Sequence, residues 1–120
     1  MILNALYVGV TDMNKSLNYY SKIFDREPVQ REKRFSMFDL GGAYFGLFNA
    51  AYDGEDLRFG NNCVPNIQVD DIEAEYNRIK NIAPRVDENI RQAGAYRYFQ
   101  FSDHDGNLVE FYSVQTIDYI

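Results

Sequence analysis

The chain has 120 residues and a formal net charge of -6, with 12 Lys and Arg against 18 Asp and Glu. This acidic balance repels phosphate backbones and anionic lipids, so we expect neither a nucleic-acid nor a membrane partner. A hydrophobic fraction of 46% argues against disorder, and no apolar run approaches the roughly 20 residues of a membrane-spanning helix.

The length predicts a single domain over residues 1–120. The N-terminus lacks the basic flank and cleavage site of a secretory signal, and the lone Cys63 has no partner for an intrachain disulfide. We therefore expect a cytoplasmic protein. The 10 Tyr and 9 Phe fit either a core of large rings or a pocket with apolar walls and polar tips.

The first half of the chain predicts a strand, a helix and then further strands. The run ALYVGV alternates like a half-buried strand, and DMNKSLNYYSKI has the spacing of an amphipathic helix. The runs RFSMFDL and AYFGLFN flank a Gly-Gly turn, which favours a hairpin. A polar, Gly-rich connection follows, within the segment AAYDGEDLRFGNNC.

The second half repeats this order of elements. The run VPNIQV predicts a strand, DIEAEYNRIK a helix, and YRYFQF and NLVEFYSV two strands around the turn DHDGN. Aligning Asp12 with Asp71 aligns the apolar positions of the two predicted helices: Met13, Leu17 and Tyr20 with Ile72, Tyr76 and Ile79. The chain is thus predicted to be a tandem duplication, with module one at 1–50, a linker at 51–62 and module two at 63–120.

One carboxylate stands inside the last apolar run, where Glu110 is flanked by Val109 and Phe111. A buried charge is costly unless it is paired, hydrogen-bonded, neutralised or bound to a metal. Glu110 therefore either lines a pocket or faces solvent, at an open sheet face or the rim of a dimer.

The motifs DHDGNLVEF, VTDMNKSLNYYSKIF and VDDIEAEYNRIK, together with the doubled order of elements, resemble the vicinal oxygen chelate superfamily. This family includes glyoxalase I, bleomycin resistance proteins and extradiol dioxygenases. The resemblance covers essentially the whole chain, although His104 replaces the proline usual in the turn. Arg97 stands where many members carry an arginine. The resemblance implies an α+β fold of two βαβββ modules, whose eight strands form a curled, cup-shaped mixed sheet with the helices outside.

The resemblance also implies four metal-ligand positions, which fall here on Ala5, Gly46, Val64 and Glu110. Three of these residues have no side-chain donor, whereas a divalent cation needs about three or more protein ligands. His104 lies in the turn, too far along the strand to substitute for them, and is expected to be solvent-exposed. We therefore expect no metal site and no cofactor, and metal-dependent glyoxalase or dioxygenase activity is not expected.

Strand alternation predicts which side chains face the inside of the cup. Residues on the helix side are almost all apolar, among them Phe45, Leu47, Val109 and Phe111. The side chains on the other face mix aromatic rings with amides and one acid, the makeup of a small-molecule pocket. The predicted ligand-binding residues are Tyr7, Tyr44, Phe48, Asn66, Gln68, Glu110 and Tyr112. Ala5 and Gly46 are expected to leave room for a ligand.

Two functions remain open. The chain either binds a small apolar or aromatic molecule, including a cationic one, or it is a metal-independent isomerase or lyase with Glu110 as the catalytic general base. The binding function is preferred because no second titratable group is paired with Glu110 by spacing. A purely structural, dimeric scaffold is a third alternative. Family analogy also predicts a homodimer.

Overall fold

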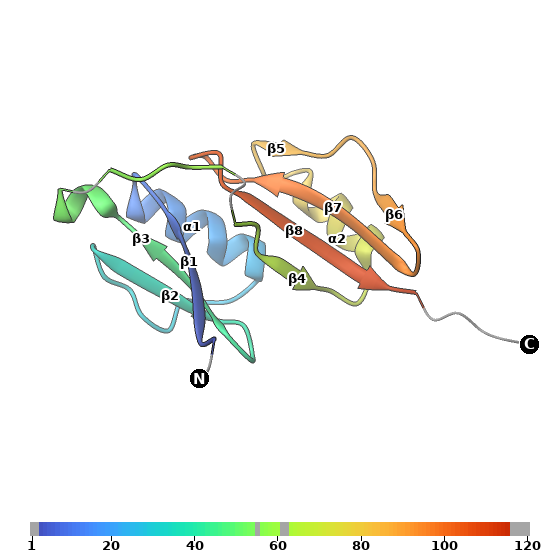
Figure 1. Ribbon diagram of the computed structural model, residues 1–120, viewed down its shortest axis with the longest axis horizontal. Helices are drawn as coiled ribbons and strands as arrows, with labels where there is room; N and C mark the ends of the chain where they lie inside the picture. The colour runs from blue at the N-terminus through green and yellow to red at the C-terminus, as the bar shows by residue number, and fades with distance from the viewer. Residues whose placement is uncertain (1–2, 55, 61–62, 116–120) are drawn as a thin grey trace, which may run out of the picture. The chain divides into compact units, whose positions relative to one another are not determined.

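The computed structural model describes residues 3–54, 56–60 and 63–115 (Figure 1). The chain divides into two compact units. Unit 1 comprises Met1–Gly60 with His104–Asn107, and unit 2 comprises Asn61–Asp103 with Leu108–Ile120. The break at Gly60 falls inside the expected linker. The single-domain organisation and the module boundaries stay predictions.

Unit 1 contains a three-stranded sheet and one long helix. Its elements are β1 (Ala5–Gly9), α1 (Met13–Phe24), β2 (Phe35–Asp39), β3 (Tyr44–Phe48) and the short 3-10 helix η1 (Ala50–Asp53). The strand order is β1-β3-β2, in which β1 runs parallel to β3 and β2 antiparallel to it.

Unit 2 contains a five-stranded sheet and one shorter helix. Its elements are β4 (Asn66–Gln68), α2 (Ile72–Ile79), β5 (Arg85–Val86), β6 (Arg91–Ala93), β7 (Tyr96–Ser102) and β8 (Leu108–Val114). The order is β4-β8-β7-β5, with β6 also pairing with β7. As in unit 1, the first strand runs parallel to the last one.

The two units share a topology but differ in strand number. Where unit 2 has the short strand β5, unit 1 has only an isolated antiparallel bridge between Gln30 and Met37. Where about three strands were expected after each helix, the described residues have two strands and a bridge in unit 1 and four strands in unit 2. An α+β fold with two helices and mixed sheets is confirmed; within the described residues the strands form two sheets rather than one continuous ladder.

Both helices begin at the aspartates that the repeat aligned. The Oδ1 atom of Asp12 accepts a hydrogen bond from the Lys15 amide at 3.1 Å, and that of Asp71 accepts one from the Ala74 amide at 3.0 Å. Such an N-cap satisfies one of the amides that a helix start leaves without a partner. The caps fix where each helix begins, and so which of its faces meets the sheet.

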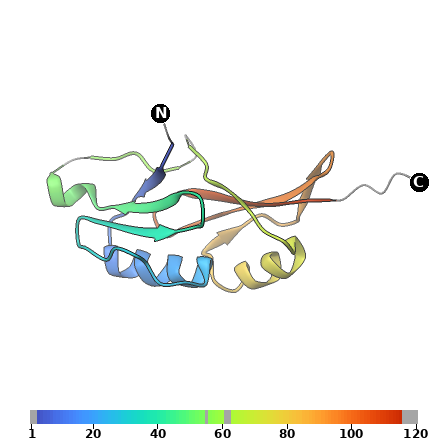
Figure 2. The ribbon, with the colours of Figure 1, turned by 90° about the horizontal axis from the view of Figure 1, so that it is seen from below.

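Each helix covers one face of its own sheet (Figure 2). In unit 1, Phe45 and Leu47 of β3 are buried on the side of α1, where Tyr20 and Ile23 are also buried. In unit 2, the rings of Phe99 and Phe111 and the side chain of Val109 are buried together with Ile72 and Ile79 of α2. The predicted helix-side positions of β3 and β8 are therefore confirmed, and polar side chains are left to the opposite face.

The DHDGN turn joins β7 to β8, and its residues His104–Asn107 belong to unit 1, where they bond to the segment that follows β1 and to β1 itself. The amide and hydroxyl of Thr11 donate to the carboxylate of Asp105 at 3.2 and 2.6 Å. The Asn107 side chain donates to the Gly9 carbonyl at 2.7 Å. His104 is exposed, as predicted, and its ring lies edge-on to that of Tyr19 with 5.1 Å between centroids. Across the described ranges, no helix is long and apolar enough to cross a membrane.

Removing the cap of α2 tests this account of the helix starts. We expect Asp71→Ala to lower the free energy of unfolding by about 0.5–2 kcal/mol, because the Ala74 amide loses its acceptor. The neighbouring Asp70→Ala is the matched control, and chemical denaturation measures both. Equal effects of the two substitutions would show that the loss of negative charge, not of the cap, matters.

Candidate functional site

The face of the unit 2 sheet opposite α2 carries two rows of polar and aromatic side chains. In the first row, Gln100 of β7, Glu110 of β8 and Asn66 of β4 stand opposite one another. The second row lies two residues along the strands, on the same face of the sheet. It consists of Arg91, Tyr98, Tyr112 and Gln68. The strand register thus brings together residues from four separate segments of the chain.

Glu110 lies between two side-chain amides. The Nδ2 atom of Asn66 donates to Oε2 at 2.8 Å, and the Nε2 atom of Gln100 donates to Oε1 at 3.2 Å. Glu110 is half-buried, so these contacts partly replace the water that its carboxylate loses. The carboxylate therefore has neutral hydrogen-bond donors on both neighbouring strands, without an ion-pair partner among the described residues.

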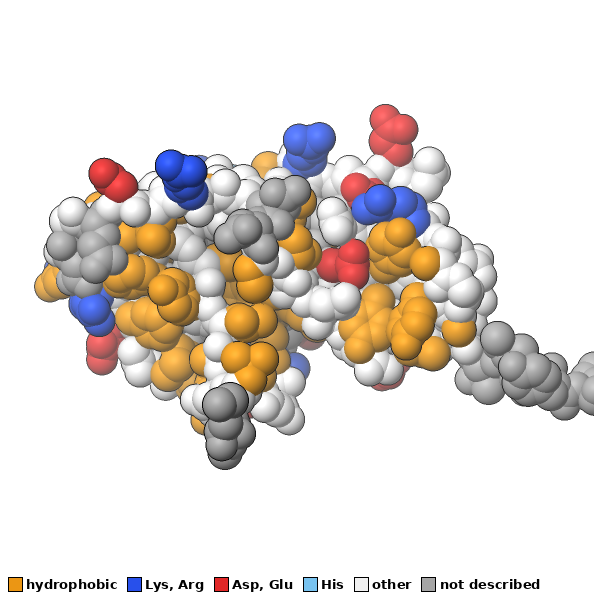
Figure 3. Space-filling view, in the orientation of Figure 1, with side chains coloured by type: hydrophobic (Ala, Val, Ile, Leu, Met, Phe, Trp, Pro, Cys, Tyr) orange, Lys and Arg blue, Asp and Glu red, His pale blue; other side chains and the backbone are white. Residues whose placement is uncertain are grey.

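An open hollow with a volume of about 570 Å³ lies on this face. It is lined by Asn66, Ala93, Tyr96, Tyr98, Glu110 and Tyr112. The rings of Tyr96 and Tyr112 lie 6.0 Å apart between centroids. In Figure 3 apolar side chains gather over this end of β7 and β8, next to acidic and basic groups. The volume and the mixture of rings with a few polar groups suit a small molecule.

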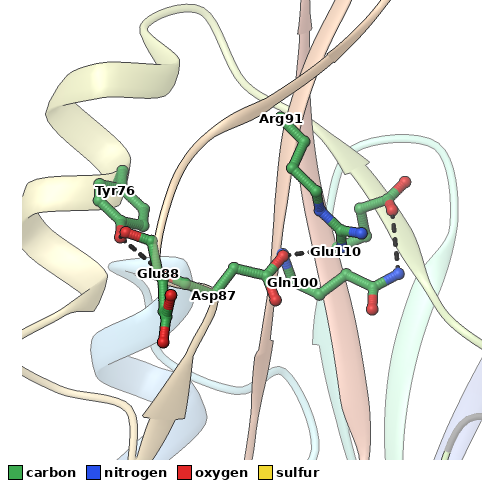
Figure 4. Close-up of polar contacts among 6 residues, drawn as sticks. All are labelled: Tyr76, Asp87, Glu88, Arg91, Gln100 and Glu110. Atoms are coloured by element: carbon green, nitrogen blue, oxygen red, sulfur yellow. Dashed lines mark hydrogen bonds and ion pairs between the residues drawn. The ribbon is translucent and has the colours of Figure 1, made fainter.

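A chain of contacts connects α2 to the site (Figure 4). The Tyr76 hydroxyl lies 2.6 Å from the Asp87 carbonyl and 2.7 Å from that of Glu88. The carboxylate of Asp87 accepts hydrogen bonds from the Gln100 backbone amide and from Arg91, each at 2.8 Å. The Arg91 guanidinium lies over the Tyr98 ring, 5.0 Å from its centroid. Asp87 thus fixes both Gln100 and the arginine beside the hollow.

Sequence reasoning found half of the hollow. Asn66, Glu110 and Tyr112, three of the predicted ligand-binding residues, line it, and Gln68 lies beside it, where its side-chain oxygen accepts from the Tyr112 hydroxyl at 3.4 Å. That they bind a ligand stays a prediction. The residues that were missed are Ala93, Tyr96, Tyr98 and, next to the hollow, Arg91 and Gln100. Alternation along YRYFQF places Tyr96, Tyr98 and Gln100 on one face and could have identified them.

Two of the predicted residues of unit 1, Tyr7 and Phe48, lie in an aromatic cluster with Phe35. The ring of Tyr7 meets those of Phe35 and Phe48 edge-on, at 5.9 and 5.6 Å between centroids. Tyr44 is half-buried at the start of β3. The expected room at Gly46 is absent, because a side chain there would meet the Phe35 ring at 2.5 Å. That expectation was wrong, and it failed because β2 places Phe35 beside a glycine that sequence alone cannot pair with it.

Arg97, which stands where many members of the family carry an arginine, does not line the hollow. Its guanidinium forms an ion pair with Glu73 of α2 at 3.0 Å. Arg97 alternates with Tyr96 and Tyr98, so it lies on the helix-covered face of β7.

A second hollow, of about 520 Å³, lies in unit 1 near the start of α1. Its polar lining includes the acids Asp12 and Glu32 and the bases Arg31 and Lys33. It contains no residue predicted from the sequence to bind a ligand. We therefore take the hollow of unit 2 as the candidate site.

Comparison with known proteins gives consistent matches. Residues 2–111 match the Glyoxalase/Bleomycin resistance protein/Dioxygenase superfamily. The fosfomycin resistance protein FosX of Listeria innocua is 29% identical over 118 residues, which cover 92% of this chain and 88% of the relative.

Solved structures agree in fold. A glyoxalase/bleomycin resistance protein/dioxygenase family enzyme of Burkholderia phytofirmans superposes with a TM-score of 0.78 at 13% identity, covering 95% of this chain and 99% of the other. A protein of Agrobacterium tumefaciens superposes with a TM-score of 0.81 at 17% identity, covering 97% and 100%. At such low identities the likeness concerns the fold alone.

The residues at the family's metal-ligand positions do not fit a metal ion. Ala5, Gly46 and Val64 offer no donor atoms, and both oxygens of Glu110 face amide N–H groups, which repel a cation. In the part of the chain that the structure describes, no group of three or more His, Cys, Asp or Glu side chains could hold an ion. We derive no chemistry through a metal.

The lack of ligand side chains at these positions predicts that the protein binds no divalent metal ion. We expect titration with Mn²⁺, Zn²⁺ or Mg²⁺ to show no stoichiometric binding by calorimetry or native mass spectrometry, because Glu110 is a single available ligand. The Glu110→Ala variant should behave like the unchanged protein. One tightly bound ion per chain that is lost in Glu110→Ala would contradict this assignment.

Proposed function

Because the chain belongs to the Glyoxalase/Bleomycin resistance protein/Dioxygenase superfamily, we propose that it uses the family's sheet face to bind a small apolar or aromatic molecule, including a cationic one, without a metal. The observation that carries the proposal is the hollow of unit 2, in which three tyrosines surround the amide-bound carboxylate of Glu110. Rings supply apolar contact area, and their hydroxyls remain available to polar groups.

The neighbours of Glu110 favour binding over catalysis. A general base needs a path by which its proton is taken up and returned, and catalytic acids and bases therefore occur in pairs of titratable groups. The hydrogen-bond partners of Glu110 are Asn66 and Gln100, whose amides do not titrate. An isomerase or lyase reaction that starts from Glu110 would have to use a tyrosine hydroxyl of the hollow as its second proton carrier.

The proposal extends to assembly. It includes a curled, cup-shaped mixed sheet of eight strands and a homodimer in the cytoplasm. Two observations support a further contact surface: Tyr7 is 57% exposed and Phe59 41% exposed, although both side chains are aromatic. Light scattering on the purified protein measures the oligomeric state.

Truncating one aromatic wall tests the binding function. We expect Tyr112→Leu to weaken binding of 1-naphthylmethylamine by about tenfold, because leucine keeps apolar bulk but loses the ring and the cation–π attraction. Isothermal titration calorimetry measures the affinity.

The matched control is Tyr52→Leu, which removes an exposed tyrosine ring from unit 1. It should leave the affinity unchanged. Thermal unfolding of both variants verifies that each is folded at the temperature of the titration. Equal affinities of Tyr112→Leu and the unchanged protein would place the binding surface elsewhere.

A further inference from the structure

The carboxylate of Glu110 determines which groups donate and which accept the hydrogen bonds around it. An ionised carboxylate can only accept hydrogen bonds, so the NH₂ group of each neighbouring amide must face it. The distances of 2.8 Å from Asn66 and 3.2 Å from Gln100 agree with this assignment. Each amide consequently turns its carbonyl oxygen away from Glu110.

These three side chains offer a ligand mainly acceptors. Among the described residues no donor reaches the carbonyl oxygens of Asn66 and Gln100, and the two oxygens of Glu110 keep lone pairs after accepting one hydrogen bond each. The row Gln100, Glu110 and Asn66 therefore presents four oxygen atoms and one negative charge.

Two of the donors near this row are already engaged. The Tyr112 hydroxyl donates to Gln68, and Arg91 donates to Asp87 while its guanidinium lies over Tyr98. Arg91 and Asp87 offset each other as an ion pair. Glu110 has only neutral partners, so its charge remains available to a ligand.

We propose that Asn66, Glu110 and Gln100 act as an acceptor triad that selects ligands carrying a cationic hydrogen-bond donor, such as an ammonium or amidinium group on a flat apolar body. The triad disfavours carboxylates and other anions. Glu110 contacts the ligand cation, whereas Asn66 and Gln100 are positioning residues that hold the carboxylate and add carbonyl oxygens. The inference rests on the proposed function, since it specifies the ligand of the same hollow.

The physical basis is the cost of leaving a charge or acceptor unpaired. An anionic group over the triad would meet a like charge, while an ammonium group completes the hydrogen bonds of oxygens that a ligand separates from water. The tyrosines of the hollow add attraction between their ring faces and the cation. Both effects act in the same direction.

Three naphthalene probes of similar size test the preference for a cationic ligand: 1-naphthylmethylamine, 1-naphthalenemethanol and 1-naphthoic acid. We expect calorimetry near neutral pH to give the ammonium probe an affinity at least tenfold above that of the carboxylate, with the neutral alcohol between them. The chain contains no Trp, so naphthalene fluorescence provides an independent readout without tryptophan background.

Substitutions then test whether the triad causes the preference for the ammonium probe. Glu110→Gln should weaken the ammonium probe about tenfold and change the alcohol less than twofold, because it removes the charge but keeps the shape. Gln100→Leu should lower the ratio of the ammonium to the alcohol affinity without altering the alcohol affinity itself. The matched control is Glu73→Gln, which removes the same charge from α2, where Glu73 pairs with Arg97. It should leave all three affinities unchanged.

The outcomes separate this inference from the proposed function. Equal binding of the three probes, or an ammonium preference that persists in Glu110→Gln, overturns the acceptor triad and leaves the binding function standing. A preference lost equally in Glu73→Gln also overturns it, because net charge would then be the cause. Failure of every probe to bind the unchanged protein overturns the proposed function and the triad together.

Discussion

The parallel pairing of β4 with β8 places Asn66 directly opposite Glu110, and the chemistry of the site depends on this register. A shift of one residue would turn every side chain of β4 to the other face, and the carboxylate would lose one of its two amide donors. Hydrogen bonds to a charged group contribute about 1.5–3 kcal/mol each, which is enough to hold a half-buried carboxylate at a sheet surface. The same register places Gln68 beside Tyr112 and so completes the second row.

The general fold could be predicted from the sequence because it follows from short-range patterns. Asp12 and Asp71 indicate where the helices start, and alternation identifies the helix-covered side chains of β3 and β8. These signals lie within a few residues of the elements that they specify. The short strands β5 and β6 have no such signal, because two or three residues are too few for a period to emerge.

The site was harder to predict because it depends on contacts between distant segments. Glu110 stood out as an acid in an apolar run, but its partner Gln100 is identified only once the antiparallel register of β7 and β8 is known. The place of Asp87 depends on a loop held by Tyr76 of α2, a contact that no local pattern encodes. Gly46 shows the opposite error, since a missing side chain suggested space that Phe35 fills.

The proposed function gives the acid on the last strand a role without a metal. The last strand keeps its acid, but Ala5, Gly46 and Val64 leave that acid without companions for an ion. A single carboxylate on a sheet face still needs compensation, and the amides of Asn66 and Gln100 supply it from both neighbouring strands. Amide donors leave the negative charge in place, whereas a metal would have replaced it with a positive one. In the proposed function, this position therefore attracts cationic hydrogen-bond donors.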